Sequence, residues 1–235
     1  MWCLNLIEQG RWTRIQFEGE SPAPRVYHSA SLCRNGSATG MLVVFGGRNN
    51  TGEAMNDTWG LRKHRSGKFD WMKAPYRSAT VPIGRHQHKC IFVGTLLLVI
   101  GGRSNEVNEA MPLDIYDTDT SEWHRGPQVD RFRHAAFLKD ENLHLYGGFD
   151  LAAPNIPTSS IIKINLERMF STNNNPSFFR SLAVETGKDY FSVPTTTDPS
   201  LRGSRSHQQA RRMEEAHRQL PSPSHRRYSE KHMDI

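Results

Sequence analysis

Residues 85–102, Arg-His-Gln-His-Lys-Cys-Ile-Phe-Val-Gly-Thr-Leu-Leu-Leu-Val-Ile-Gly-Gly, contain the pattern that decides the fold. An Arg-x-x-His phrase is followed by apolar residues and ends in paired glycines. The same arrangement occurs three times, with Arg-x-x-His at 25–28, 85–88 and 131–134 and Gly-Gly at 46–47, 101–102 and 147–148. Three copies of one composite phrase predict an internal structural repeat.

The spacing of the copies gives the size of the repeating unit. The first glycines of successive pairs are 55 and 46 residues apart. His88 and His134 each precede the first glycine of their pair by 13 residues, whereas His28 precedes its glycine by 18 residues. The extra five residues fall in the polar segment 34–39, where a hairpin loop can absorb them. A period of about 50 residues leaves room for four short strands in each unit.

Further apolar runs and tryptophans complete the predicted unit. After each Gly-Gly a polar loop leads to another apolar run, at 56–61, 113–116 and 161–166, and Trp71 and Trp123 close the first two units. This pattern is typical of four short strands, each of four to seven residues and bounded by Gly, Pro, Asn or Asp. The predicted units are residues 21–77, 78–129 and 130–170, the last without an obvious closing tryptophan, and residues 1–20 with Trp12 look like the second half of a unit.

The repeat resembles the kelch repeat, whose four-stranded blades build β-propellers. The resemblance implies an all-β fold: a partial kelch β-propeller of about three and a half four-stranded blades over residues 1–170. We expect the paired glycines to end the second strand of each blade where positive φ or close packing excludes a side chain; these are Gly46, Gly47, Gly101, Gly102, Gly147 and Gly148. We expect Trp71 and Trp123 to pack between neighbouring blades. An unclosed propeller has open sheet edges, which favour self-association.

Residues 25–76 carry a closer resemblance. Phrases such as Val-Phe-Gly-Gly-Arg at 44–48, Asn-Asp-Thr-Trp-Gly-Leu-Arg at 56–62 and Phe-Asp-Trp-Met-Lys-Ala-Pro-Tyr at 69–76 resemble the N-terminal kelch domain of the kelch-type serine/threonine protein phosphatases of plants and protists. In that family the propeller is taken to recruit or regulate substrates, and a linker and a two-metal phosphatase domain follow it. The resemblance implies that this chain is a fragment or truncated form of such a phosphatase.

Catalysis is not expected from this sequence. Two-metal phosphatases present their metal ligands in phrases of the type Gly-Asp-x-His-Gly, Gly-Asp-x-x-Asp-Arg-Gly and Gly-Asn-His-Glu, and none of these occurs here. We therefore predict a non-catalytic protein-interaction module with no catalytic residue, metal or cofactor. Two alternatives remain open: a kelch-based enzyme of the copper oxidase type, and a substrate adaptor of a ubiquitin ligase. The first needs Tyr, Cys and His ligands brought together by a complete propeller, and the second normally has a helical dimerisation domain before the repeats.

The composition changes after residue 170. Residues 171–235 form a low-complexity polar tail or linker, rich in Asn, Thr, Ser, Arg and His, and we expect most of it to be disordered because few large apolar residues remain. A short helix is predicted within 206–220, where apolar residues recur at three- and four-residue steps. Ser204, Ser206 and Ser229 lie beside basic residues and are candidate phosphate acceptors.

Charge and cysteine content limit the class of partner. The 235-residue chain has a formal net charge of +6, but its basic residues alternate with acidic ones without forming a run, so no nucleic acid is expected as a partner. No secretory signal and no apolar stretch long enough to span a membrane occur in the sequence, so no membrane partner is expected. Three cysteines, Cys3, Cys33 and Cys90, cannot all pair. These features predict a reducing environment, cytoplasmic or also nuclear.

Five arginines are the candidate binding residues. Arg25, Arg85 and Arg131 are expected to begin the innermost strand of each blade, where they either ring one mouth of the central channel or brace the fold by donating to carbonyl groups of the adjacent blade. Arg48 and Arg103 directly follow Gly-Gly and start exposed loops on the same face. Guanidinium groups that converge there would suit an acidic or phosphorylated peptide. The equivalent histidines His28, His88 and His134 are expected to hydrogen-bond within their blades and not to bind metal.

Overall fold

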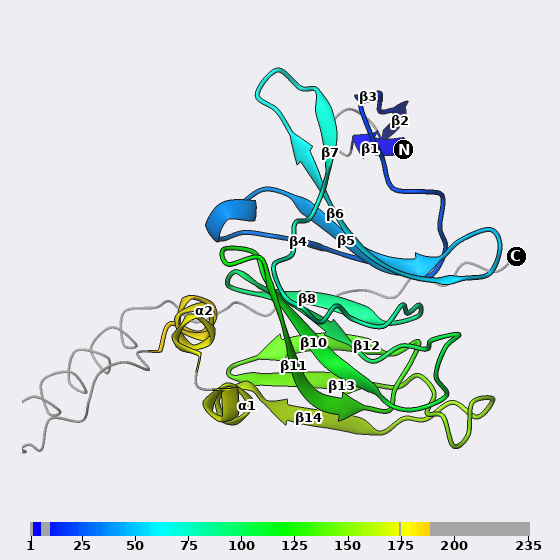
Figure 1. Cartoon of the computed structure of the whole chain (residues 1–235), viewed down its shortest axis with the longest axis vertical. Helices are drawn as coiled ribbons and strands as arrows, with labels where there is room; N and C mark the ends of the chain where they lie inside the picture. The colour runs from blue at the N-terminus through cyan, green and yellow to red at the C-terminus, as the bar shows by residue number, and fades with distance from the viewer. Residues whose placement is uncertain (1, 6–9, 174, 189–235) are drawn as a thin grey trace, which may run out of the picture. The chain divides into compact units, whose positions relative to one another are not determined.

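The computed structural model describes residues 2–5, 10–173 and 175–188, and these form antiparallel sheets followed by two helices (Figure 1). The all-β prediction for the repeat region is confirmed. The helix predicted within 206–220 and the serines of the tail lie outside the described residues, as does most of the predicted tail.

The first complete sheet corresponds to the predicted unit 21–77. Its strands are β4 (Ser29–Leu32), β5 (Leu42–Arg48), β6 (Ala54–Lys63) and β7 (Phe69–Lys73), in the antiparallel order β7-β6-β5-β4, with the short 3₁₀ helix η1 (Gly36–Ala38) in the loop between β4 and β5. The strand β3 (Phe17–Glu18) joins this sheet by parallel pairing with β7, and β1 (Trp2–Asn5) and β2 (Arg11–Arg14) form a separate antiparallel pair. Residues 1–20 were predicted as half a blade, but part of this segment extends the sheet that follows.

The second sheet corresponds to the unit 78–129. It contains β8 (Lys89–Val93), β9 (Leu96–Ile100), β10 (Met111–Asp117) and β11 (Glu122–Val129), in the order β11-β10-β9-β8. All five residues of β9 are buried. A strand that consists only of apolar residues is buried when both faces of its sheet are covered. Here the first sheet packs on one face and the third sheet packs on the other.

The third sheet has three described strands, β12 (Ala135–Lys139), β13 (Asn142–Tyr146) and β14 (Ile161–Asn165), and two helices follow it, α1 (Leu166–Asn173) and α2 (Pro176–Thr186). The prediction of a four-stranded blade is therefore wrong for the described part of this unit. Leu166 already donates its backbone N–H to Glu141 O, so the chain turns into α1 directly after β14.

Ordered structure continues past the predicted boundary at residue 170 into the segment that was predicted as tail. Asn175 caps α2 by accepting from Ser177 N, Pro176 begins the helix, and Gly187 ends it in the left-handed region with φ 69°. Phe178 and Leu182 are buried in the same cluster as the second and third sheets. The polar composition of this stretch concealed two apolar anchors one helical turn apart.

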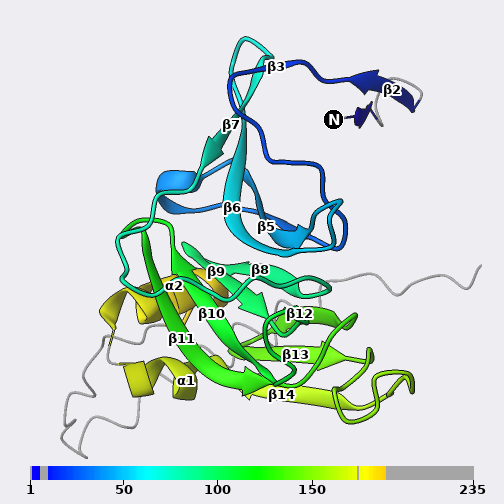
Figure 2. The same ribbon diagram turned by 45° about the vertical axis from the view of Figure 1, so that its right-hand side comes forward.

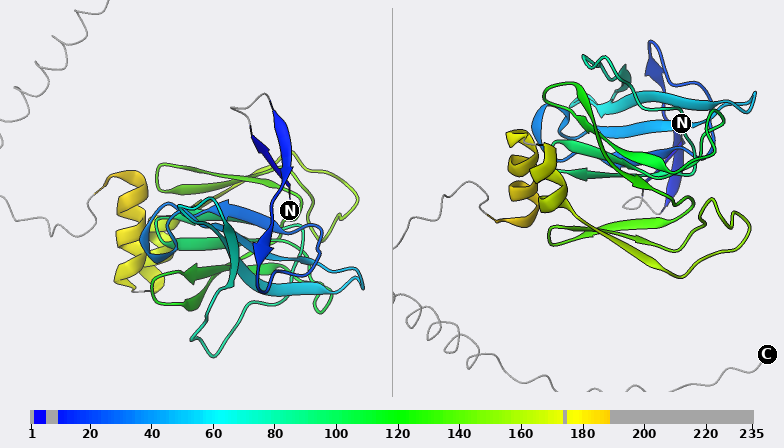
Figure 3. Two further views of the ribbon diagram at one scale, coloured as in Figure 1. Left: turned by 90° about the horizontal axis from the view of Figure 1, so that it is seen from above. Right: turned by 60° about the horizontal axis from the view of Figure 1, so that its bottom comes forward.

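Two apolar clusters join the sheets. The first lies between the first and second sheets, where Phe45, Tyr116 and Trp123 meet with ring centroids 5.0–5.5 Å apart. The second lies between the second and third sheets and is closed by residues of α1 and α2. The inner strands β4, β8 and β12 lie side by side, with β8 next to β12 in Figure 2, and both helices gather at one end of the strands (Figure 3).

The two closing tryptophans have different surroundings. Trp123 is buried between blades, as its ring contacts with Phe45 and Tyr116 show. Trp71 is only half-buried and meets Phe17 edge to face with centroids 6.5 Å apart. Trp71 lies on the first complete sheet, where the short β3 segment supplies its aromatic neighbour.

Candidate protein-binding site on the loop face

The third residue of each Arg-x-x-His phrase has a left-handed backbone although it is not glycine. Tyr27, Gln87 and Arg133 have φ values of 59°, 60° and 54°. Gln87 N donates to Tyr27 O and Arg133 N donates to Gln87 O, each at 2.9 Å. Left-handed backbone costs a non-glycine residue roughly 1–2 kcal/mol, and here it is held by a ladder of hydrogen bonds that links the three blades.

The paired glycines fit against these phrases. Gly46 and Gly101 have φ values of 59°, and Gly47 and Gly102 donate their backbone N–H to Arg85 O and Arg131 O of the next blade at 2.9 Å. A Cβ added at Gly46 would lie 2.7 Å from Arg85 O. The glycines therefore allow the backbone of one blade to approach the arginine of the next.

The repeat arginines are directed into their own blades. The guanidinium of Arg85 is completely buried, with 0% of the residue exposed, and forms an ion pair with Asp114 while Nη1 donates to Pro112 O at 2.8 Å. Arg25 donates to Gly46 O at 3.0 Å and to both oxygens of Asp57 at 2.5 and 2.8 Å.

Arg131 follows the same geometry with weaker acceptors, because it donates to Gly147 O at 2.9 Å and to Ser160 Oγ at 3.0 Å. These three arginines were predicted to begin the innermost strands, but each lies four residues before its strand. They brace the fold as one alternative proposed, although the acceptors belong to their own blade and not to the adjacent one. The channel-mouth alternative is wrong for Arg85, which has no exposed surface.

The loop arginines have a different environment. The bridges Val26–Arg48 and His86–Arg103 attach the residue after each Gly-Gly to the neighbouring phrase. Arg48 Nε donates to Gly52 O at 2.6 Å, and the same carbonyl accepts from Asn105 Nδ2 at 2.9 Å. The loops that follow Arg48 and Arg103 are therefore in direct contact.

Aromatic rings orient two of the guanidinium groups. Arg103 lies over the ring of Phe132, 4.9 Å from its centroid, and Arg133 lies 5.9 Å from the centroid of Phe149. Phe132 and Phe149 are stacked with centroids 5.6 Å apart. With the amide of Gln87 turned so that its oxygen faces Arg133, it accepts from Nη2 at 2.9 Å and from Nε at 3.1 Å. These contacts hold both guanidinium groups against aromatic rings.

His86 lies beside this group, because it is bridged to Arg103 and directly precedes Gln87, and 8% of the residue is exposed. Burial, followed by the charges of Arg48, Arg103 and Arg133, lowers the pKa of His86 below its usual value. Its Nδ1 is buried and has no hydrogen-bond partner within the described residues. In the described part of the chain no ion pair links a carboxylate to any of the three arginines. We call Arg48, Arg103 and Arg133 around His86 the arginine face.

Arg133 and His86 were not among the predicted site residues. The third position of the repeated phrase is Tyr, Gln or Arg in the three copies, so the pattern gave it no role. The left-handed backbone that turns this position toward its counterparts is a property of the packed blades. His86 was given no role, because only the histidine at the fourth position of the phrase recurs in all three copies.

Comparison with known proteins identifies the repeat. A family model described as KLHDC2/KLHL20/DRC7 Kelch-repeats domain matches residues 1–170. The chain belongs to this kelch-repeat family. This result confirms the kelch resemblance inferred from the repeated phrases, and the three sheets are kelch blades.

Several larger kelch proteins are similar to the chain. It is 29% identical over 175 residues to Serine/threonine-protein phosphatase BSL2 of Arabidopsis thaliana, covering 63% of the chain and 16% of the phosphatase. It is 29% identical over 159 residues to Tip elongation aberrant protein 1 of Schizosaccharomyces pombe (64% and 13%) and 26% identical over 158 residues to an F-box/kelch-repeat protein of Arabidopsis thaliana (61% and 31%). The chain spans less than a third of each of these relatives.

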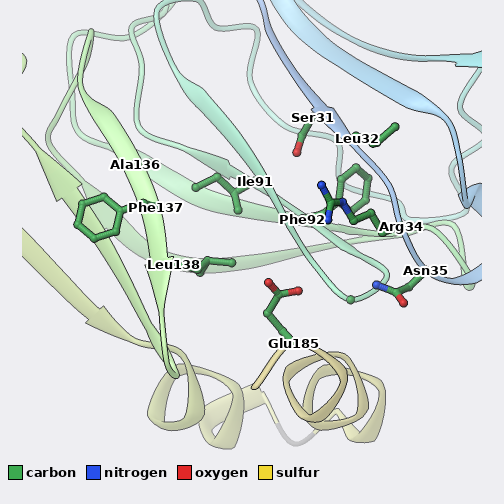
Figure 4. A pocket seen from close by; sticks show the side chains of 11 residues that line it. Ser31, Leu32, Arg34, Asn35, Ile91, Phe92, Ala136, Phe137, Leu138 and Glu185 are labelled. Carbon is green, nitrogen blue, oxygen red and sulfur yellow. The ribbon is translucent and has the colours of Figure 1, made fainter. Parts of the chain in front are cut away.

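A hollow lies at the ends of the inner kelch strands that are away from the arginine face (Figure 4). It has a volume of about 390 Å³ and is lined by residues of β4, β8 and β12 together with Glu185 of α2. Arg34 and Glu185 are its charged side chains, and Ile91 and Leu138 are among its apolar ones. Both signs of charge are present, so this hollow lacks the uncompensated positive charge of the arginine face.

The kelch histidines are packing residues. Burial lowers the pKa of His88 well below its usual value and, with Lys89 and Arg131, lowers that of His134 to about 4. The prediction that these histidines hydrogen-bond within their blades is wrong for His88 and His134, because both ring nitrogens of each are buried without a hydrogen-bond partner in the described residues. Within 2–5, 10–173 and 175–188, no group of His, Cys, Asp or Glu could hold a metal ion, and no helix is long and apolar enough to cross a membrane.

Proposed function

We propose that this kelch domain is a non-catalytic recognition module that captures an acidic or phosphorylated segment of a protein partner on the arginine face. The observation that carries the proposal is that Arg48, Arg103 and Arg133, each held by its backbone against a neighbouring Arg-x-x-His phrase, have no carboxylate partner among the described residues. Structural arginines in the same blades donate to Asp57, Asp114 or Ser160, whereas the three arginines of this face have no carboxylate partner among the described residues.

The face is suited to binding because its cations are already oriented. Immobilising a flexible arginine on binding costs about 0.5–1.5 kcal/mol, and a contact that fixes the side chain in the free protein reduces this cost. Arg48 is fixed by Gly52 O, Arg103 by the ring of Phe132, and Arg133 by Gln87. Guanidinium groups bind carboxylates and phosphates by paired hydrogen bonds, which give the binding its geometry.

The parent protein in this proposal is a kelch-type serine/threonine phosphatase. The chain is similar to the phosphatase BSL2 and carries none of the metal-binding phrases of a phosphatase domain, so it would recruit or regulate phosphoprotein substrates without acting on them. Its similarity to an F-box/kelch-repeat protein supports a ubiquitin-ligase adaptor as the second candidate. We place the domain in the cytoplasm or nucleus, where its buried free cysteines Cys33 and Cys90 would stay reduced.

A second copy of the chain is also a proposed partner. Phe45 and Ile100, directly before Gly-Gly in the first two blades, are completely buried, whereas the equivalent Tyr146 is 49% exposed. Its cross-strand partner Ile161 is 60% exposed. We propose that another copy covers this face of the third sheet. Sedimentation velocity at increasing concentration should show a dimer that Tyr146→Glu abolishes; a strictly monomeric chain would exclude this partner.

The main proposal is tested by direct binding. Fluorescence anisotropy with degenerate peptide pools should show binding of acidic and phosphorylated pools to the unmodified chain and no binding of neutral pools. The double substitution Arg48→Ala with Arg103→Ala should weaken that binding by at least about tenfold, because two charge-assisted contacts are lost. The exposed Arg65, in the turn after β6, provides the control Arg65→Ala. If Arg65→Ala weakened peptide binding as much as the double substitution does, the effect would come from the net charge of the protein. The arginine face would then not be the binding site.

A further inference from the structure

We propose that the ligand of the arginine face is a phosphate monoester on a protein segment and not a carboxylate side chain. This inference rests on the proposed function and narrows it to one chemical class. It follows from the number of cations, from the donors that remain available on them, and from the unpaired imidazole among them.

The charge of the face exceeds what a carboxylate can balance. Arg48, Arg103 and Arg133 bring three positive charges from three blades, and no described carboxylate pairs with them. A carboxylate carries one negative charge on two oxygens. A phosphate monoester carries about −1.5 to −2 at neutral pH on three strongly accepting oxygens, so it balances more positive charge and accepts more guanidinium donors than a carboxylate does.

Each arginine keeps donors for such a ligand. Arg48 uses Nε for Gly52 O, and Arg133 uses Nε and Nη2 for Gln87, which leaves Nη1 of both side chains available. Arg103 is held by the face of Phe132 and has no hydrogen-bonded side-chain acceptor among the described contacts, so its planar fork remains free. The interactions that orient these groups therefore do not consume their binding capacity.

His86 differs from the other histidines with unpaired buried nitrogens, such as His88 and His134, because it lies beside the arginine face. Its imidazole is more than nine-tenths buried, and Nδ1 has no partner within the described residues. A buried nitrogen without a hydrogen bond costs free energy that a bound acceptor or donor would recover. The charged groups that face it are Arg48 after β5, Arg103 after β9 and Arg133 before β12, and the ring of Tyr27 lies 6.2 Å away. All three charges are positive, so the ligand that fits beside this ring is an anion that accepts a hydrogen bond from a ring N–H.

The deciding experiment compares three degenerate peptide pools that differ only in a fixed central residue, which is phosphoserine, glutamate or serine. Anisotropy titrations of the complete chain should give at least about tenfold tighter binding of the phosphoserine pool than of the glutamate pool, with no binding of the serine pool. Equal binding of the phosphoserine and glutamate pools would overturn this inference and leave the proposed function intact. Binding of neither anionic pool would overturn both.

A second measurement localises the phosphate. Inorganic phosphate titrated into ¹⁵N-histidine-labelled protein should shift the His86 signals and raise the pKa of His86, because the anion offsets the three arginine charges. Acetate at the same ionic strength should leave them unchanged, and Arg133→Gln should abolish the response, whereas Arg65→Gln should retain it. An equal response to acetate would contradict the inference. Preference for vesicles containing a phosphoinositide over all peptide pools would overturn the assignment to a protein ligand.

Discussion

The second and third blades carry the same phrases but differ in what covers them. Ile100 of the second blade is completely buried by the third sheet and the helices, whereas Tyr146 at the equivalent position of the third blade is half exposed. Arg85 forms a buried ion pair with Asp114, and its counterpart Arg131 donates to Ser160. The comparison shows that a repeat phrase specifies a local geometry, while its energetic weight depends on the neighbouring blade.

The paired glycines show the same difference at the level of single atoms. A Cβ at Gly101 would lie less than 3.0 Å from the carbonyl oxygen of Arg131 in the next blade. A Cβ at Gly147 would meet its nearest neighbour, Thr158 O, at the ordinary distance of 3.5 Å. Both glycines have positive φ, so backbone strain is common to them and the clash is specific to the covered blade.

The largest expected effect separates these two glycines. Gly147→Ala should cost about 1–2 kcal/mol of unfolding free energy, the usual penalty for a left-handed alanine. Gly101→Ala should cost at least about 4 kcal/mol, because the backbone of Arg131 must also move. Urea unfolding followed by tryptophan fluorescence measures both values. Similar losses would mean that the second and third blades do not pack as closely as the structure shows.

The repeat arginines provide the next contrast. Arg85→Leu should destabilise the chain by about 3–5 kcal/mol, because Asp114 is left as a buried charge whose remaining ion-pair partner is the exposed Arg125 at 3.7 Å. Arg131→Leu should cost only about 1–3 kcal/mol, since its acceptors are a carbonyl and a hydroxyl.

The double variant Arg85→Leu with Asp114→Leu is the control for that prediction. It should recover much of the stability lost in Arg85→Leu, because it removes the unpaired carboxylate. If the double variant loses the sum of both single losses, desolvation of Asp114 is not the cause.

The first blade extends the comparison to a partly exposed pair, Arg25 and Asp57. Burial alone would raise the pKa of Asp57, but hydrogen bonds from Arg25 and Trp59 and the charge of Arg25 outweigh it and lower the pKa below its usual value. A carboxyl group whose pKa is lowered by folding stabilises the folded state at pH values above its ordinary pKa of 3.8. This stabilisation is lost as the pH falls through the lowered pKa of the folded state. Asp57→Asn should therefore cost about 1 kcal/mol near pH 7, after solvent screening, and converge with the unmodified chain near pH 3. A pH-independent difference between the two unfolding curves would contradict this.

The smallest stability effect is expected on the arginine face. Arg48→Ala with Arg103→Ala should change the unfolding free energy by less than about 1 kcal/mol for each substitution, because the first removes one hydrogen bond, the second removes one cation–π contact, and neither removes an ion pair in the described part of the chain. Calorimetry on the variant used in the binding test measures this directly. A loss of unfolding free energy as large as that of Arg131→Leu would mean that Arg48 and Arg103 stabilise the fold, as the repeat arginines do.

Sequence reasoning located the blades but not the contents of the site. The repeated phrases predicted the strands around each Gly-Gly, and Arg48 and Arg103 were identified because they follow these glycines. Arg133 was missed because nothing in Tyr, Gln or Arg at a variable position indicates a left-handed backbone. The helix α2 was missed because Phe178 and Leu182 are isolated in a polar stretch, and only their burial against the second and third sheets shows their role.

The sequence by itself determined the kelch repeat, its period and the positions where glycine is required, since these follow from local backbone geometry and from alternation along each strand. Only the tertiary structure decided which arginines donate to Asp57, Asp114 or Ser160 within the fold and which have no carboxylate partner among the described residues. That outcome depends on whether Asp57, Asp114 or Ser160 of the same blade reaches the guanidinium, and on how three phrases from different blades meet around His86. Contacts of this kind join residues far apart in the chain, and no local pattern encodes them.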